Sequence, residues 1–394
     1  MKAVILAAGE GLRLRPFTET KPKVMLPVGN KPIIHHVIDA LTNTSIDEII
    51  IVIGYQKNKI LHYFKDHPHL PLTFIEQDKQ LGTAHALLQA QQQINEDFLV
   101  VFGDNLIDAH SLQQIIDLPQ SHGLLITSHD HPSNYGVVTV KDSMVTKITE
   151  KPNKDENRFI ATGIYKFNNT IFDHIQQTID KGELGMSAVI QSLIEHDITI
   201  GTKNTTKWKD VVYPWDLLSV NESYASSITR KIGGTIEKNV QMKGPIQIGE
   251  NTRISSGTYL VGPLIIGNDC EIGPNSCIFP STVIGDNCVI QPFTSIRNSI
   301  IMEDSRIGAH TYIARSILGE RINMGHHVTL PEHTSLVHIN DEILQVRDVG
   351  VMIGEDTNID HQVSIDPGVI IGKDCHVDSL NHVTKNIPST VHVI

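Results

Sequence analysis

The 394-residue chain carries 44 acidic and 32 basic side chains, a net charge of −12, and 40% of its residues are apolar. This is the composition of a globular protein of two or three domains, and it excludes general nucleic-acid binding, which requires a basic surface. No apolar run approaches the ~18 residues of a membrane span or forms a signal-peptide core, and the four cysteines make no CxxC pair. We therefore expect a cytoplasmic enzyme without nucleic-acid or membrane partners.

Short apolar strands alternate with helical patterns up to about residue 225. The strand candidates are 3–7, 49–53, 72–75, 98–102 and 124–127, and the helix candidates are 32–41, 57–64 and 83–93. This alternation predicts an α/β domain over 1–225, with a mostly parallel sheet covered by helices on both faces. Ligands of such sheets bind beyond the carboxyl ends of the strands.

The first predicted strand runs into a glycine loop followed by cations. LAAGEGLRLRP stands at 6–16 and KPKVMLP at 21–27. The loop is not a dinucleotide fingerprint, because Leu14 replaces the third glycine, and it lacks the GK[ST] ending of a P-loop. Its glycines allow backbone N–H groups to approach a phosphate, and Arg13 and Lys23 add positive charge. A tight strand-to-helix turn with solvated cations is the alternative.

From about residue 245 the apolar residues recur every six positions. The series is Ile248, Ile254, Leu260, Ile266, Ile272, Ile278, Ile284, Ile290 and Ile296, then Ile301, Ile307 and Ile313 after a slip of one, and later Ile353, Ile359, Ile365, Ile371, Val377 and Val383. A triangular β-solenoid has this period, with one face per six residues and one coil per eighteen. We assign 245–394 to the solenoid, 226–244 to a linker helix and connection, and 331–348, which breaks the rhythm, to a projecting loop.

The cysteines follow the same period. Cys270, Cys288 and Cys375 stand at the small position four residues after an inward apolar one, whereas Cys277 is one place out of phase. We expect the first three to be buried small hydrophobes and Cys277 to be exposed.

Further motifs make the chain similar to a known family. They are QDKQLGTAHA at 77–86, FGDN at 102–105, YGVV at 135–138, EKP at 150–152, ATGIY at 161–165 and PWD at 214–216. With the N-terminal loop they resemble the sugar-1-phosphate nucleotidylyltransferases. With the solenoid, the whole chain resembles the archaeal-type relatives of the bifunctional N-acetylglucosamine-1-phosphate uridylyltransferase / glucosamine-1-phosphate acetyltransferase. The resemblance implies a Rossmann-like nucleotidyltransferase domain followed by a left-handed parallel β-helix.

The resemblance assigns roles to particular residues. Arg13 and Lys23 would be catalytic, Arg13 on the triphosphate and Lys23 between the sugar phosphate and the α-phosphate. Asp104 and Asp216 would bind Mg²⁺, although Asp216 equally fits a helix N-cap. The remaining assignments are Leu6, Ala8, Gly9, Gly11, Gln77, Gly82 and Thr83 to the nucleotide, and Gly136, Glu150, Lys151 and Gly163 to the sugar. Glu150 has the alternative of a solvated acid on an edge strand.

The implied reaction forms an NDP-sugar and pyrophosphate from a nucleoside triphosphate and a hexose 1-phosphate, either N-acetylglucosamine 1-phosphate or glucose 1-phosphate. QLGTAHA favours UTP over dTTP, but Ala161 stands where the uridylyl enzymes usually carry asparagine. The resemblance also implies a homotrimer or a dimer of trimers. A non-catalytic regulatory or scaffold homologue is a further alternative.

A second activity, acetyl transfer from acetyl-CoA, depends on the solenoid. Its base would be His310 in IGAHTYIARSILGE, but Tyr312 follows two residues later where the bifunctional relatives have three, and Arg347, Asp348 and Val349 replace the expected lysine. A shift of one residue turns a strand side chain to the opposite face. We therefore predict that acetyl transfer is weak or absent and that His310 is a histidine at a turn; a bifunctional enzyme is the alternative.

Overall fold

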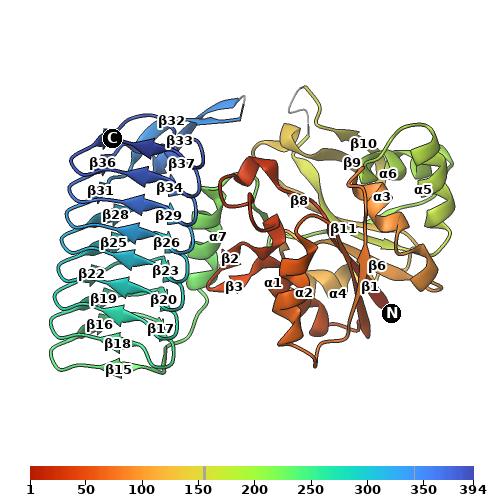
Figure 1. Cartoon of the computed structure of the whole chain (residues 1–394). Helices are drawn as coiled ribbons and strands as arrows, with labels where there is room; N and C mark the ends of the chain where they lie inside the picture. Colours follow the sequence, from red (N-terminus) through yellow and green to blue (C-terminus); the bar gives the residue numbers. More distant parts are fainter. Residues whose placement is uncertain (154–156, 341) are drawn as a thin grey trace. The chain divides into compact units, whose positions relative to one another are not determined.

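The computed structural model describes residues 1–153, 157–340 and 342–394. The chain forms two units (Figure 1). The first consists of Met1–Glu10, Lys21–Met25 and Pro32–Asp210, and the second of Gly11–Thr20, Leu26–Lys31 and Val211–Ile394. Among the described residues, no helix has both the length and the apolar character needed to cross a membrane.

A nine-stranded sheet forms the centre of the first unit. Its order is β5 (Leu72–Glu76), β4 (Glu48–Ile53), β1 (Lys2–Ala7), β6 (Phe98–Phe102), β11 (Phe159–Phe167), β8 (Gly123–Ser128), β12 (Gly201–Asn204), β10 (Met144–Glu150) and β9 (Gly136–Lys141). The strands β5, β4, β1 and β6 are parallel neighbours, as are β8 and β12, whereas β11 is antiparallel to β6 and β8. The predicted α/β fold with a mostly parallel sheet is confirmed.

Helices cover both faces of this sheet (Figure 1). Because successive strand side chains point to opposite faces, β1 gives Ala3 and Ile5 to one core and Val4 and Leu6 to the other. The helices of the first core are α1 (Ile33–Thr42), α2 (Lys57–Lys65) and α4 (Ala109–Ile116); those of the second are α3 (Thr83–Leu88), α5 (Ile171–Asp180) and α6 (Met186–Glu195). The helix predicted over 83–93 ends at Leu88 and is followed by a 3₁₀ turn at Gln91–Gln93.

The second unit contains α7 (Asp216–Ala225) and a left-handed parallel β-helix of three sheets. One sheet comprises β14 (Lys231–Ile232), β17 (Ile246–Ile248), β20 (Leu264–Ile266), β23 (Thr282–Ile284), β26 (Ile300–Ile301), β29 (Ile317–Leu318), β34 (Met352–Ile353) and β37 (Ile370–Ile371). The next comprises β15 (Thr235–Ile236), β18 (Arg253–Ile254), β21 (Glu271–Ile272), β24 (Val289–Ile290), β27 (Arg306–Ile307), β30 (Asn323–Met324), β35 (Asn358–Ile359), β38 (His376–Val377) and β40 (His392–Val393). The third comprises β16 (Gln241–Lys243), β19 (Tyr259–Val261), β22 (Cys277–Ile278), β25 (Ser295–Arg297), β28 (Tyr312–Ala314), β31 (Thr329–Leu330), β36 (Ser364–Ile365) and β39 (His382–Val383).

The core of the solenoid is the predicted apolar series. Its isoleucines stack in one cluster and are almost fully buried, as Ile254, Ile272 and Ile290 illustrate with exposures of 0 to 1%. Three cysteines are buried in the same cluster as predicted, namely Cys270, Cys288 and Cys375, whereas Cys277 is half-buried rather than exposed. Each coil therefore adds apolar residues to a continuous column, which is how a solenoid buries a core.

Two segments of the solenoid unit differ from the prediction. Residues 231–243, assigned to the linker, form β14, β15 and β16 of a first coil. The six-residue series continues backwards through Met242 and Ile236, which pair with Leu260 and Ile254 eighteen residues on, so the sequence analysis began the solenoid one coil too late. Only Ile232 departs from the period, because it pairs with Ile248 sixteen residues on. Residues 331–348, predicted as a loop, lie largely in an antiparallel hairpin of β32 (His333–Ile339) and β33 (Glu342–Val349).

Candidate active site

The loop after β1 is fastened to the neighbouring strand ends. Leu6 accepts a hydrogen bond from the backbone N–H of Gly103 at 2.9 Å, and Ala8 accepts one from Tyr55 at 3.1 Å. Gly9 is exposed, and a Cβ placed on it would meet no atom within 4 Å. The loop therefore holds its backbone against the carboxyl ends of the strands and has open space beside Gly9, as a phosphate cradle requires.

Gln77, predicted to bind the nucleotide, is buried beside the N-terminus of α3. The Gln77 side chain donates to the Gly82 carbonyl at 3.3 Å and contacts His85 Nδ1 at 2.8 Å. Gly82 has φ +146°, and a Cβ on it would lie 2.4 Å from the Leu184 carbonyl oxygen. Glycine is therefore required for this approach between the start of α3 and the segment before α6.

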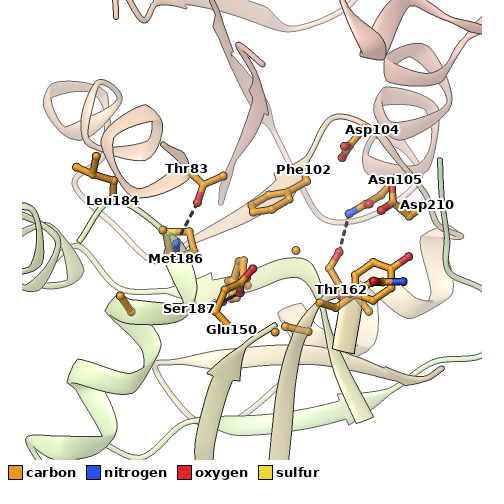
Figure 2. Close-up of a pocket in the computed structure, with 18 of the residues that line it drawn as sticks. Thr83, Phe102, Asp104, Asn105, Glu150, Thr162, Leu184, Met186, Ser187 and Asp210 are labelled. Atoms are coloured by element: carbon orange, nitrogen blue, oxygen red, sulfur yellow. Dashed lines mark hydrogen bonds between the residues drawn. The ribbon is translucent and has the colours of Figure 1, made fainter. Parts of the chain in front are cut away.

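Thr83 also contacts the segment at the start of α6. Its hydroxyl accepts a hydrogen bond from the Met186 N–H at 3.0 Å (Figure 2). The Ala84 N–H donates to the Leu184 carbonyl at 2.9 Å. The N-termini of α3 and α6 are thus joined, and Thr83 faces the pocket that lies beside them.

A pocket of about 550 Å³ lies in the first unit (Figure 2). Five predicted site residues line it: Thr83, Asp104, Gly136, Glu150 and Gly163. The other lining residues are Phe102, Asn105, Asn134, Tyr135, Ala161, Thr162, Tyr165, Glu183, Leu184, Gly185, Met186, Ser187, Ala188, Trp208 and Asp210. Its size suits a small polar ligand such as a sugar phosphate.

Two carboxylates and one ammonium meet at the acidic end of this pocket. Lys23 Nζ lies 2.5 Å from Asp104 Oδ2 and 3.1 Å from Asp210 Oδ1, and all three side chains are largely buried. Burial alone lowers the pKa of Lys23, but the two carboxylates more than offset it, so the pKa is raised and the ammonium stays charged. The carboxylate oxygens of Asp104 and Asp210 are hard donors of the kind that Mg²⁺ prefers, so these two residues fit the metal.

Asp210 was missed by the sequence analysis. It lies on β13 (Lys209–Asp210), which pairs with β7 (Asn105–Leu106) so that Asp210 stands opposite Asn105. Asn105 and Trp208 both donate to the Thr162 carbonyl, at 2.7 and 3.0 Å, which fastens this pair of strands to β11. The one signal in the sequence is the spacing Trp208–x–Asp210, which places both side chains on one face of a strand.

The Asp216 carboxylate accepts hydrogen bonds within its own turn. Asp216 belongs to the second unit, and its Oδ2 accepts hydrogen bonds from the N–H groups of Val212 and Tyr213 at 2.9 and 2.8 Å. Its carboxylate therefore stabilises the turn that leads into α7. A metal-binding role for Asp216 stays a prediction.

The end of the pocket predicted to bind the sugar is built on β9, β10 and β11. Glu150 Oε2 accepts a hydrogen bond from the Ser187 hydroxyl at 2.6 Å. Gly163 has φ +78°, and a Cβ on it would lie 2.7 Å from the Phe102 ring, so a side chain there would both strain the backbone and enter the pocket wall. Lys151, in contrast, is exposed, and it is not among the residues that line the pocket.

Arg13 belongs to the second unit, in the 3₁₀ turn Leu12–Leu14 that follows the left-handed Gly11. It contacts other residues of this unit. The Arg13 guanidinium lies 3.6 Å from Glu342 Oε1 and 5.8 Å from the centroid of the Tyr213 ring. Tyr213 donates its hydroxyl to the other Glu342 oxygen. Burial and this acceptor raise the pKa of Tyr213 to about 12, so the phenol stays a donor at neutral pH.

His310 lies at a turn of the solenoid. It is exposed and has φ 58°, and its ring stacks between those of Phe293 and His327 with centroids 4.9 and 4.8 Å away. This is the place expected of the predicted turn histidine.

Comparison with known proteins shows the family to which the chain belongs. Residues 2–227 match the nucleotidyl transferase family, and residues 260–349 match the GMPPB C-terminal domain. The chain is 40% identical to the bifunctional protein GlmU of Methanococcus maripaludis strain C7 over 379 residues, which cover 93% of this chain and 91% of the relative. The chain belongs to the sugar-1-phosphate nucleotidylyltransferases.

Other relatives match either the whole chain or a little over half of it. This nucleotidylyltransferase is 34% identical to the bifunctional protein GlmU of Methanocaldococcus jannaschii, over 100% of its own length and 97% of the relative's. Over 55% of its length it is 37% identical to the UTP–glucose-1-phosphate uridylyltransferase AglF of Haloferax volcanii, 93% of which is covered. A solved UDP-glucose pyrophosphorylase covers 57% of the chain, and 98% of that structure is matched, with TM-score 0.52 and 22% identity, which shows the fold alone.

Proposed function

We propose that this nucleotidylyltransferase transfers a uridylyl group from UTP to a hexose 1-phosphate, either N-acetylglucosamine 1-phosphate or glucose 1-phosphate, and releases pyrophosphate. The observation that carries the proposal is the Lys23 ammonium held between Asp104 and Asp210 at one end of the pocket. A sugar in the pocket would have its 1-phosphate directed to this charged end.

In the proposed reaction a phosphate oxygen of the sugar phosphate attacks the α-phosphorus of UTP in line, and the bond to the pyrophosphate oxygen breaks. Asp104 and Asp210 would hold Mg²⁺, which neutralises phosphate charge when bound. Lys23 neutralises the two meeting phosphates from the protein side, and Arg13 stabilises charge on the leaving pyrophosphate. Catalysis then consists of positioning and charge stabilisation, without a covalent intermediate on the protein.

The choice of nucleotide and sugar rests on two observations. The Haloferax relative is named for UTP and glucose 1-phosphate, which supports UTP. Ala161 lines the pocket and offers it a methyl group, so it provides no amide for an N-acetyl group and supports dTTP or glucose 1-phosphate as the alternatives. Pyrophosphate release measured with UTP and dTTP against both sugar phosphates tests the proposal, and turnover with dTTP alone would contradict it.

The Glu150–Ser187 pair provides a test of the sugar end of the pocket. We expect Glu150→Gln to raise the KM for the sugar phosphate about tenfold, or ~1.4 kcal/mol, because a carboxylate that accepts from sugar hydroxyls is lost. The KM for UTP should stay within about twofold. Glu195→Gln is the matched control, since Glu195 lies at the other end of α6 and pairs with Gln191. Equal effects on both Michaelis constants would contradict a sugar-binding role.

We also propose that the solenoid contributes no efficient acetyl transfer. The observation that favours this is the His310 ring stacked at an exposed turn, with its backbone N–H donated to the Pro292 carbonyl. We expect release of free thiol from acetyl-CoA with glucosamine 1-phosphate to be at background. The names of the GlmU relatives support the alternative. Robust turnover that disappears in His310→Ala, but persists in His327→Ala, would establish it.

The homotrimer or dimer of trimers stays a prediction.

A further inference from the structure

A cluster of histidines and aspartates lies on one sheet of the solenoid, apart from the residues used above. The strands β35, β38 and β40 are successive rungs, with Asn358 paired to His376 and His376 paired to His392. Since neighbouring rungs are ~4.8 Å apart, side chains at equivalent positions stack above one another. The rings of His376 and His392 accordingly have centroids 4.7 Å apart.

Two carboxylates converge on these imidazoles. His392 Nε2 lies 2.6 Å from Asp378 Oδ1, and His376 Nε2 lies 3.4 Å from the same oxygen. His376 Nε2 is also 3.4 Å from Asp360 Oδ1 on the adjacent rung. One ligand atom from each of His376, Asp378 and His392 lies within 4.8 Å of the others.

His376 Nε2 is buried and makes no hydrogen bond within the described part of the chain. The rest of the His376 side chain is 43% exposed, and its two carboxylate contacts at 3.4 Å are long for hydrogen bonds. A buried nitrogen without a hydrogen bond is costly, so a ligand that bridges it to these carboxylates would stabilise the cluster. The distances indicate which partner fits. Tetrahedral bonds of about 2.1 Å from one metal ion to an imidazole nitrogen and a carboxylate oxygen place these atoms ~3.4 Å apart. This is the distance from His376 Nε2 to both carboxylates.

We propose that His376, Asp378 and His392, with Asp360 as a fourth ligand, bind a divalent transition-metal ion, and that Zn²⁺ fits best. Two imidazoles and two carboxylates suit zinc, whereas Mg²⁺ prefers all-oxygen sites such as the Asp104–Asp210 pair. Two adjustments are needed: the His392–Asp378 contact must widen from 2.6 Å, and Asp360, which contacts His376 but lies outside the three-residue group, must approach the other ligands. Because the ligands come from three successive rungs, the ion would stabilise the stacking of these coils.

The experiment is a calorimetric titration of the full-length chain, stripped with chelator, with Zn²⁺ in buffer that contains excess Mg²⁺. We expect one site with a Kd of about 1 µM or tighter, and a higher melting temperature of the solenoid when zinc is present. His392→Ala, at an exposed position, and Asp378→Asn should each weaken this site at least tenfold. The double variant should abolish both the site and the shift in melting temperature.

His382→Ala is the matched control. His382 pairs with Asp366, at 2.8 Å, in the same solenoid. Its loss should leave the zinc affinity and the shift in melting temperature unchanged, and pyrophosphate release should be unchanged in all of these variants. Zinc affinity that is unaltered in His392→Ala, or reduced equally in His382→Ala, would overturn the proposal. X-ray absorption at the zinc edge should show nitrogen and oxygen ligands without sulfur.

Discussion

Asp104→Asn and Asp210→Asn should each lower kcat for nucleotidylyl transfer by at least about a hundredfold at saturating magnesium. Each substitution replaces a charged metal ligand by a neutral amide of the same size. The Lys23 ammonium keeps its other carboxylate in either variant, at 2.5 Å from Asp104 or 3.1 Å from Asp210, so we expect the fold to persist. Pyrophosphate release measured across a range of magnesium concentrations, together with circular dichroism, checks this expectation.

Two further variants make this result specific. Asp97→Asn changes an exposed carboxylate just before β6, whereas Asp104 lies just after the end of the same strand. We expect this variant to leave kcat unchanged. Asp216→Asn removes a carboxylate that accepts hydrogen bonds from two backbone N–H groups. We expect it to lower the free energy of unfolding by about 1 kcal/mol and to leave the magnesium dependence of kcat unchanged. A magnesium-dependent loss in Asp216→Asn but not in Asp210→Asn would show that Asp104 and Asp216 are the metal pair after all. Near-normal activity of Asp104→Asn would remove the metal site altogether.

Lys23→Ala and Arg13→Ala should lower kcat more than they raise KM. Both cations are proposed to stabilise charge that develops during transfer, and removal of one such group costs on the order of 3 kcal/mol of barrier, or about a hundredfold in rate. Lys23→Ala has a second expected effect. The ammonium competes with a divalent ion for Asp104 and Asp210, so its removal should strengthen Mg²⁺ binding in the absence of nucleotide.

Steady-state kinetics and a Mg²⁺ titration separate these effects. Lys209→Ala is the control, because Lys209 is exposed and stands next to Asp210 on β13. An increase in KM alone at both Arg13 and Lys23 would mean that they only bind the ground state. Weaker Mg²⁺ binding in Lys23→Ala would mean that Lys23 positions the carboxylates rather than competing for them.

The sequence alone determined both architectures, because each depends on a local period. Alternating strands and helices indicated the mostly parallel sheet, and the six-residue series from Ile248 onward indicated the solenoid whose core it forms. The pocket residues Thr83, Gly136 and Glu150 could also be named, because contiguous motifs carry them. Even so, the first coil at 231–243 was missed: Ile236 and Met242 continue the series, but Ile232 pairs out of period and these residues are only partly buried.

Only the tertiary structure decided which charged groups meet. Asp210 is 106 residues from Asp104, and it reaches Lys23 because β13 pairs with β7 next to Asp104. Asp216 stood in a clearer motif, but its carboxylate is taken by the backbone of its own turn. The contacts of His376 with Asp360 and Asp378 likewise arise from the stacking of coils. A linear pattern records which residue types are present, whereas the distances between their ionised groups are set by strand pairing between distant segments.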